Sequence, residues 1–214
     1  MDVALFLPEI QLAVSSNLSN VLSFMIASAW LPFSPMTALQ VLVQNVMYDI
    51  SQVTIPWDNM DPECLQQPRK WNTPDLVRFT MILGPPSCTI DMCTFALGWF
   101  YYYIRSTQDT EAIYRFRAHW FVQGLLTQIL NVHVFRTSKF PIVQSRASAA
   151  FVISTILAAI VGFVIPFVPA LQGALHFARP AGSFVGFLAA ELLIYCIQQQ
   201  IVKMLYIWLF KVWL

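Results

Sequence analysis

The fold is decided by the stretch Gln40-Val-Leu-Val-Gln-Asn-Val-Met-Tyr-Asp-Ile-Ser-Gln52, an apolar segment that carries an amide and a carboxylate. These two residues, Asn45 and Asp49, are four positions apart, so on a helix they lie on one face, one turn from each other. The chain around them is strongly apolar, and a carboxylate at membrane depth costs about 2.5–3.5 kcal/mol on insertion scales. Asp49 therefore needs a partner, a proton or an ion, which makes it the first candidate functional residue.

The composition of the whole chain indicates an all-α membrane protein. Hydrophobic residues make up 57% of the 214 residues and charged residues only 11%, against about 25% charged residues in a typical soluble domain. The net charge is +1 and the basic residues form no long run, so nothing suggests a nucleic-acid partner. We expect the partner of most of the surface to be a lipid bilayer.

Six segments are apolar enough to cross a membrane, for which about 20 mainly apolar residues are needed. Two prolines, Pro32 and Pro35, leave only a short link between the first two segments, which predicts an antiparallel hairpin. The sequence Gly84-Pro85-Pro86 predicts a kink or break near the start of the third segment. The predicted six-helix bundle has spans at about 12–31, 36–55, 79–104, 119–135, 147–167 and 184–201.

The basic residues between these spans predict the orientation of the chain. Six spans put both termini on one side of the membrane, and Lys and Arg are enriched on the cytoplasmic side. With cytoplasmic termini, the inner side would carry Arg69, Lys70, Arg78, Arg136, Lys139, Arg146, Lys203 and Lys211. The outer side would carry Arg105, Arg115, Arg117 and Arg179. Cytoplasmic termini are therefore favoured, and tryptophans such as Trp120 are expected at the membrane interfaces.

The first span adds amides that complement the opening stretch. Asn17 and Asn20 are three positions apart and share a helix face with Ser16. In a hairpin, this face would meet Asn45 and Asp49 of the second span. Amide, hydroxyl and carboxylate oxygens suit a hard cation such as Mg²⁺. Hydrogen bonding between helices, for which Ser and Asn are common in membrane bundles, is an equally good interpretation of these residues alone.

Several motifs, in order and at fixed spacing, resemble the magnesium-translocating P-type ATPases. These are Ser15-Ser-Asn17-Leu-Ser-Asn20, Gln44-Asn45-Val-Met-Tyr-Asp49-Ile-Ser-Gln52, Pro68-Arg69-Lys70-Trp71, Gly84-Pro85 with Ile90-Asp91 and Thr94-Phe-Ala-Leu97, and Gly124-Leu-Leu-Thr-Gln128 through His133 to Arg136-Thr137. The similarity runs from about Ala13 to the C-terminus. It covers the part that forms the last six of ten transmembrane helices in those pumps.

The resemblance implies a function and a set of cation ligands. Asn17 and Asn20 would belong to the fifth helix of such a pump, Asn45 and Asp49 to the sixth, and Asp49 would match the carboxylate that binds the transported Mg²⁺. Gln128 is a further candidate. The intact parent would couple ATP hydrolysis to magnesium movement into the cytoplasm across the plasma (inner) membrane. Asp91 also matches the pattern, and we expect a structural role for it, with hydrogen bonds near Ser87 and Thr94.

The departures from the family limit what this chain is expected to do. It contains no Asp-Lys-Thr-Gly phosphorylation sequence, no Thr-Gly-Glu loop and no ATP-binding domain. Residues 1–12 diverge from the family stalk, and Pro8 is expected to disturb a continuous helix there. Residues 13–214 are the expected transmembrane domain. The chain then resembles a C-terminal piece that is not catalytic by itself. It would hold a cation site without the ATP-hydrolysing domains that drive transport.

Alternatives to a cation-site portion of a pump remain open at this stage. The chain would be a non-catalytic subunit that pairs with a chain carrying the catalytic domains and first four helices, or a vestigial or regulatory fragment without transport activity. An unrelated ion-coupled carrier built on Asp49, Asp91 and Glu191 is disfavoured by the ordered motifs. Glu191 itself would be an ion or proton ligand, or a protonated or hydrogen-bonded carboxyl facing another helix.

Overall fold

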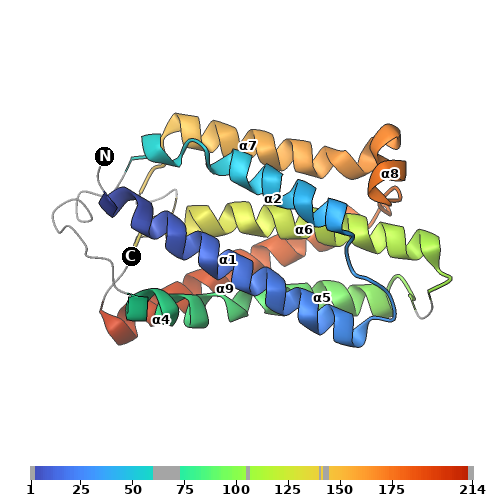
Figure 1. Cartoon of the computed structure of the whole chain (residues 1–214), viewed down its shortest axis with the longest axis horizontal. Helices are drawn as coiled ribbons and strands as arrows, with labels where there is room; N and C mark the ends of the chain where they lie inside the picture. The colour runs from blue at the N-terminus through green and yellow to red at the C-terminus, as the bar shows by residue number, and fades with distance from the viewer. Residues whose placement is uncertain (1–2, 60–72, 105–106, 140, 142–144, 212–214) are drawn as a thin grey trace.

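The computed structural model describes residues 3–59, 73–104, 107–139, 141 and 145–211, which fold as one helical bundle (Figure 1). The all-α prediction is confirmed, because the described residues contain helices and no strand. The start of α1 and the end of α9 lie at the same end of the bundle in Figure 1. Residues 60–72, most of the predicted connection between the second and third spans and including Arg69 and Lys70, lie outside the described residues.

The first two helices follow each other as predicted, but they pack differently from what we expected. Helix α1 covers Val3–Trp30 and α2 covers Ala38–Gln52, followed by the short 3₁₀ helix η1, Ile55–Trp57. The side chain of Thr37 caps α2 and forms a capping box with Gln40. The expectation that Pro8 disturbs a helix is wrong, since α1 continues through it; a proline removes one backbone hydrogen bond, which the turns on both sides tolerate in an apolar helix.

The third predicted span is two helices, as the Gly-Pro-Pro sequence indicated. Helix α4 covers Thr73–Leu83 and α5 covers Pro85–Phe100. A Cβ atom at Gly84, between them, would lie 2.8 Å from the carbonyl oxygen of Thr80 and 3.3 Å from that of Ser15. Glycine is therefore needed here for the close approach of this junction to α1.

Helix α6, Thr110–Phe135, is the central helix of the bundle and is longer than predicted. It packs against α9, α2, α7, α5 and α1. Because α6 begins at Thr110 rather than near His119, Trp120 lies inside the helix and is only 5% exposed. The expectation of an interfacial Trp120 is therefore wrong.

The last part of the chain contains the two most apolar helices. Helix α7 covers Ala149–Val164 and continues into η2, Ile165–Phe167; α8 covers Pro169–Leu175, and α9 covers Phe184–Phe210. Two described stretches are long and apolar enough to cross a membrane, Ala149–Phe167 and Phe184–Phe210. The crossing of the membrane by the other predicted spans stays a prediction.

The arrangement of α1 and α2 positions the candidate site. Helix α1 packs mainly on α4 and α5, whereas α2 packs mainly on α7 and α6. The two helices diverge in Figure 1, and α6 lies behind the space between them. The prediction that α1 and α2 pack face to face is therefore wrong. The two helices line opposite sides of a gap, because each of them packs against a different group of helices.

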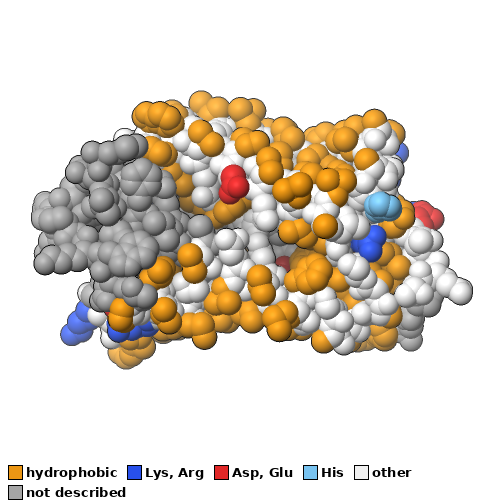
Figure 2. Space-filling view, in the orientation of Figure 1, with side chains coloured by type: hydrophobic (Ala, Val, Ile, Leu, Met, Phe, Trp, Pro, Cys, Tyr) orange, Lys and Arg blue, Asp and Glu red, His pale blue; other side chains and the backbone are white. Residues whose placement is uncertain are grey.

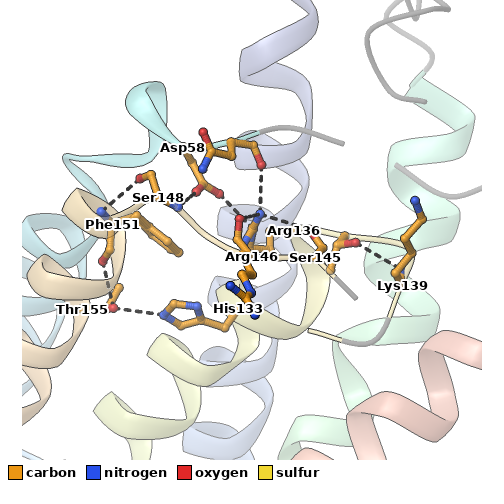
Figure 3. Close-up of polar contacts among 11 residues, drawn as sticks. Asp58, His133, Arg136, Lys139, Ser145, Arg146, Ser148, Phe151 and Thr155 are labelled. Carbon is orange, nitrogen blue, oxygen red and sulfur yellow. Dashed lines mark hydrogen bonds and ion pairs between the residues drawn. The ribbon is translucent and has the colours of Figure 1, made fainter. Parts of the chain in front are cut away.

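The end of the bundle that holds the start of α1 is fastened by a group of residues that we call the Arg136 cluster, Asp58, Arg136, Ser145 and Ser148 (Figure 3). Arg136 Nε and Asp58 Oδ2 form an ion pair at 2.9 Å, with both side chains 10% exposed. The backbone N–H of Ser148 donates to Asp58 Oδ1 at 2.6 Å, and Arg136 Nη2 donates to Ser145 Oγ at 3.3 Å. The cluster therefore ties the segment after α2 to the end of α6 and the start of α7.

Candidate cation site

A cavity of about 540 Å³ lies between α1 and α2. Its floor is formed by α6, and residues of α5 and α9 complete the wall. The polar lining residues, which we call the cavity set, are Ser16, Asn17, Ser19, Asn20, Gln44, Asn45, Ser87, Asp91, Thr127, Gln128 and Asn131. Trp120, Tyr195 and apolar residues of α1 and α2 complete the lining.

Four of the five residues predicted as cation ligands line this cavity. Asn17 and Asn20 come from α1, Asn45 from α2 and Gln128 from α6. Asp49 does not line it: its side chain is exposed on α2, one turn beyond Asn45. The meeting of the α1 and α2 amides at one cavity agrees with the sequence prediction, and the binding of a cation by any of the five stays a prediction.

The carboxylate that lines the cavity is Asp91 of α5, which is 8% exposed. Trp120 Nε1 donates to Asp91 Oδ1 at 3.0 Å, and Ser23 Oγ donates to Asp91 Oδ2. We expected hydrogen bonds near Ser87 and Thr94, on the same helix as Asp91. The hydrogen bonds instead come from α1 and α6, so Asp91 joins three helices at the edge of the cavity.

Two buried oxygens of the cavity accept no hydrogen bond. Gln128 Oε1 and Asn131 Oδ1 are inaccessible to solvent and have no partner in the described part of the chain. Their residues are only 5% and 4% exposed. Buried polar atoms are normally paired. Because neither oxygen is accessible to a water molecule, each would have to turn towards the cavity to meet water or a cation.

The floor of the cavity depends on a glycine. A Cβ atom at Gly124 would overlap the side-chain amide of Gln44, whose nitrogen donates to the carbonyl oxygen of Phe121 at 3.4 Å. The lack of a side chain at Gly124 therefore leaves room for the side chain of Gln44, which extends from α2 across α6. This contact holds α2 close to α6, and both helices contribute an amide to the lining, Asn45 and Gln128.

The chemistry of the cavity is that of an oxygen site with little charge. The described residues bring no three of His, Cys, Asp and Glu close enough to hold a metal ion together. Amide and hydroxyl groups make up the rest of the cavity set, and Asp91 supplies its one carboxyl group. Such a set fits a hard divalent cation that keeps several of its waters, as Mg²⁺ usually does.

The other carboxyl that the sequence singled out, Glu191, lies away from the cavity lining. It is hydrogen-bonded to two other helices: Thr94 Oγ1 donates to Glu191 Oε1 at 2.9 Å, and Glu191 Oε2 lies 2.9 Å from His119 Nε2. Of the two interpretations left open, the structure therefore shows the hydrogen-bonded carboxyl that faces other helices.

These features define an α-helical membrane domain with an internal, oxygen-lined site, and the comparisons with known proteins agree. Residues 33–205 match the family described as cation transporting ATPase, C-terminus, and the chain belongs to that family. It is 43% identical over 205 residues to magnesium-transporting ATPase, P-type 1, of Salmonella typhimurium (strain LT2), with 95% of this chain and 22% of the relative covered.

The Escherichia coli K12 protein of the same name gives a similar result. The identity is 43% over 200 residues, covering 94% of this chain and 22% of the relative. The chain therefore spans about a fifth of the length of these curated relatives. The family resemblance predicted from the sequence motifs is confirmed.

Proposed function

We propose that this chain forms the cation-binding membrane part of a magnesium-transporting P-type ATPase. The observation that supports this most is the cavity between α1 and α2, with two buried amide oxygens that lack a partner. The names of the relatives supply the ion, since both are magnesium-transporting ATPases. In this proposal the side chains of Gln128 and Asn131 turn these oxygens into the cavity, where they bind the cation.

The proposed roles of the lining residues follow from their chemistry. Asn17, Asn20, Asn45 and Gln128 supply neutral oxygens to the hydrated cation, and Asp91 supplies negative charge from the wall. Neutral ligands around a single carboxylate keep the binding weak enough for release, which transport requires. Asp49 lies on the exposed face of α2; we propose that it joins the site when further helices of the pump cover that face.

The energy for transport comes, in this proposal, from ATP-hydrolysing domains and further membrane helices outside the described fold. These belong to the same polypeptide or to a partner chain. The alternative is a non-catalytic or regulatory membrane subunit without transport activity. The family membership agrees with a transporting pump and with a subunit that does not transport. The transport experiment below distinguishes these two functions.

We also propose that the bundle lies in the plasma (inner) membrane with both termini in the cytoplasm. The end that holds the start of α1 and the end of α9 carries most of the described cations, namely Arg78, Arg136, Lys139, Arg146, Lys203 and Lys211. Positive charge is enriched on the cytoplasmic side of membrane proteins. Large apolar side chains are exposed on α7 and α9, as lipid contact requires.

Magnesium uptake in cells that lack their own uptake systems tests the proposal. The chain is expressed alone and beside a chain with the catalytic domains and first four helices, and its presence in the membrane is checked. We expect uptake only with the partner, and loss of uptake in Asn45→Leu and Asp49→Asn. Glu111→Gln, which alters an exposed side chain far from the cavity, is the control and should retain uptake. Absence of uptake in both settings would favour a regulatory or vestigial fragment.

A further inference from the structure

The Asp91 carboxyl group, which lines the cavity, already accepts hydrogen bonds at both of its oxygens. Trp120 Nε1 donates to Asp91 Oδ1 at 3.0 Å, and Ser23 Oγ donates to Asp91 Oδ2. The side chain of Gln123 also hydrogen-bonds to this carboxyl group. A carboxylate offers about four lone-pair positions on its two oxygens. Most of these positions, on the one acidic residue of the cavity set, are therefore used by the protein itself.

The three partners of Asp91 are held in place by packing. Ser23 comes from α1 and is 0% exposed. Trp120 and Gln123 come from α6, three positions apart and hence on one helix face, and both are buried. The ring of Phe95 packs edge-on against Trp120, with the ring centroids 4.9 Å apart. Partners that are fixed by packing keep the carboxyl group in one orientation.

A cation in the cavity would reach this carboxyl group most easily through a bound water molecule. Direct coordination by a carboxyl oxygen would displace one of the buried donors, and a buried donor without an acceptor is costly. A water molecule of a hydrated ion needs only one remaining lone pair. The cavity has room for such an ion, since six waters occupy about 180 Å³ at about 30 Å³ each, against a cavity volume of about 540 Å³.

Divalent cations differ in how readily they exchange water for a carboxylate. Mg²⁺ loses its waters reluctantly and usually keeps several of them when it is bound. Ca²⁺ takes roughly six to eight oxygen ligands, and carboxylates coordinate it directly. A carboxyl group that is reached only through water is therefore well suited to Mg²⁺, and it gives Ca²⁺ less than a free carboxylate would.

We propose that Trp120 and Ser23 are specificity-determining residues of the cavity. By occupying both oxygens of Asp91, they keep this group from coordinating the cation directly and thereby favour Mg²⁺ over Ca²⁺. This rests on the proposed function, because it needs a cation in the cavity. It assigns the selectivity to two side chains that act through Asp91 and not through contact with the ion.

The test compares the affinities for Mg²⁺ and Ca²⁺ of the complete assembly in lipid nanodiscs, measured without ATP by titration calorimetry. Trp120→Phe keeps an aromatic ring against Phe95 and removes the N–H that binds Asp91. We expect the affinity for Ca²⁺ relative to Mg²⁺ to rise by about tenfold, the effect of gaining one charge-assisted contact. Trp208→Phe, which alters an exposed side chain of α9 outside the cavity lining, is the matched control and should keep the wild-type ratio.

Ser23 provides the second variant if Trp120→Phe does not assemble. Ser23→Ala removes the other donor and should shift the ratio of affinities in the same direction. Ser23→Thr keeps a hydroxyl group at this position and should restore the wild-type ratio. A side chain that acted only in packing would change the stability, or both affinities together, and would leave the ratio unchanged.

A double variant shows whether the effect passes through Asp91. In the Asp91→Asn background, Trp120→Phe releases no carboxyl group, so it should no longer change the ratio of the affinities. A change in the ratio that persists in this background would contradict the proposed role of Trp120.

The failure of this inference is distinguishable from the failure of the proposed function. If Mg²⁺ still binds and the ratio is unchanged in both Trp120→Phe and Ser23→Ala, the inference is overturned and the cation site remains. If Gln128→Leu leaves Mg²⁺ binding unchanged, the proposed function itself is contradicted.

Discussion

Gln128 and Asn131 each bury an amide oxygen that accepts no hydrogen bond in the described structure. An unpaired buried acceptor costs about 1–3 kcal/mol of stability. A side chain kept only for packing would gain stability from replacement by an apolar residue of similar size. Because both residues line the cavity, we propose that their amides are kept for binding and not for packing.

We expect Gln128→Leu to leave the stability of the assembly equal or higher, by up to about 1 kcal/mol, because it removes an unpaired oxygen. The same change should lower magnesium affinity by about tenfold, the effect of losing one charge-assisted contact. Thermal unfolding and equilibrium magnesium binding, measured on the same preparation, check both effects.

Gln40→Leu is the matched control for that prediction. Like Gln128, Gln40 is a buried amide, and it is 0% exposed. Its oxygen accepts a hydrogen bond from the backbone N–H of Thr37, and its nitrogen donates to the carbonyl oxygen of Leu175. Its replacement should destabilise the assembly and leave magnesium affinity unchanged. A loss of stability for Gln128→Leu as large as for Gln40→Leu would indicate that Gln128 is a structural residue.

The sequence predicted which amides line the cavity but not the partners of its carboxyl group, and the reason is physical. Asn17, Asn20, Asn45 and Gln128 were found because amides in apolar helices are few and their spacing shows which face they share. The hydrogen-bonded role expected for Asp91 is confirmed, but its partners Ser23 and Trp120 were not predicted because they lie far away in sequence. Neither spacing on α5 nor composition reveals such partners, whereas the packing of α1 and α6 against α5 does.

At the scale of elements, the Arg136 cluster connects three parts of the chain that lie far apart in sequence (Figure 3). The Asp58 carboxylate binds Arg136 at the end of α6 and the backbone N–H of Ser148 at the start of α7. Both charged side chains are largely buried. Removal of one partner from a buried pair leaves an uncompensated charge, which makes this cluster a sensitive point of the fold.

Asp58→Ala should therefore destabilise the assembly by about 3–5 kcal/mol, because Arg136 loses its buried partner and Ser148 loses an acceptor. The measurement is the midpoint of thermal unfolding in detergent. Glu111→Ala, which breaks the exposed Arg115–Glu111 pair, is the comparison and should change stability by about 0–1 kcal/mol. Similar midpoints for the two variants would mean that the Arg136 cluster does not fasten the bundle.

The elements themselves were predicted to different extents. The break at Gly84 followed from Gly-Pro-Pro, since proline cannot donate the backbone hydrogen bond that a continuous helix needs. The length of α6 was missed because its first turns carry Glu111, Arg115 and Arg117, which an apolar-run criterion excludes. Those side chains sit at the end of the bundle, where a helix extends past an apolar layer at little cost.

At the scale of the molecule, the exposed surface is largely apolar where the helices run along the bundle (Figure 2). Exposed large apolar side chains include Ile153, Leu157 and Ile160 of α7 and Leu193, Ile197 and Leu205 of α9. Apolar surface of this extent indicates contact with lipid or with further helices. The cavity lies between α1 and α2, so the proposed cation site is between an apolar exterior and a polar interior.

The divergence of α1 and α2 could not be predicted from sequence. A short link and two apolar segments indicate antiparallel neighbours, and that order is present. Whether such neighbours touch is decided by the other helices with which each packs, here α4 and α5 for α1, and α6 and α7 for α2. The cavity is therefore a property of the whole bundle and is encoded in no single segment.

We propose above that the cavity between α1 and α2 holds the transported cation. The most direct measurement is a structure of the complete assembly with Mn²⁺ in place of Mg²⁺, with the ion located by its anomalous scattering. We expect one ion inside the cavity, coordinated directly or through water by the amides of Asn45 and Gln128 and near the carboxyl group of Asp91. An ion bound elsewhere in this chain, with the cavity empty, would contradict it.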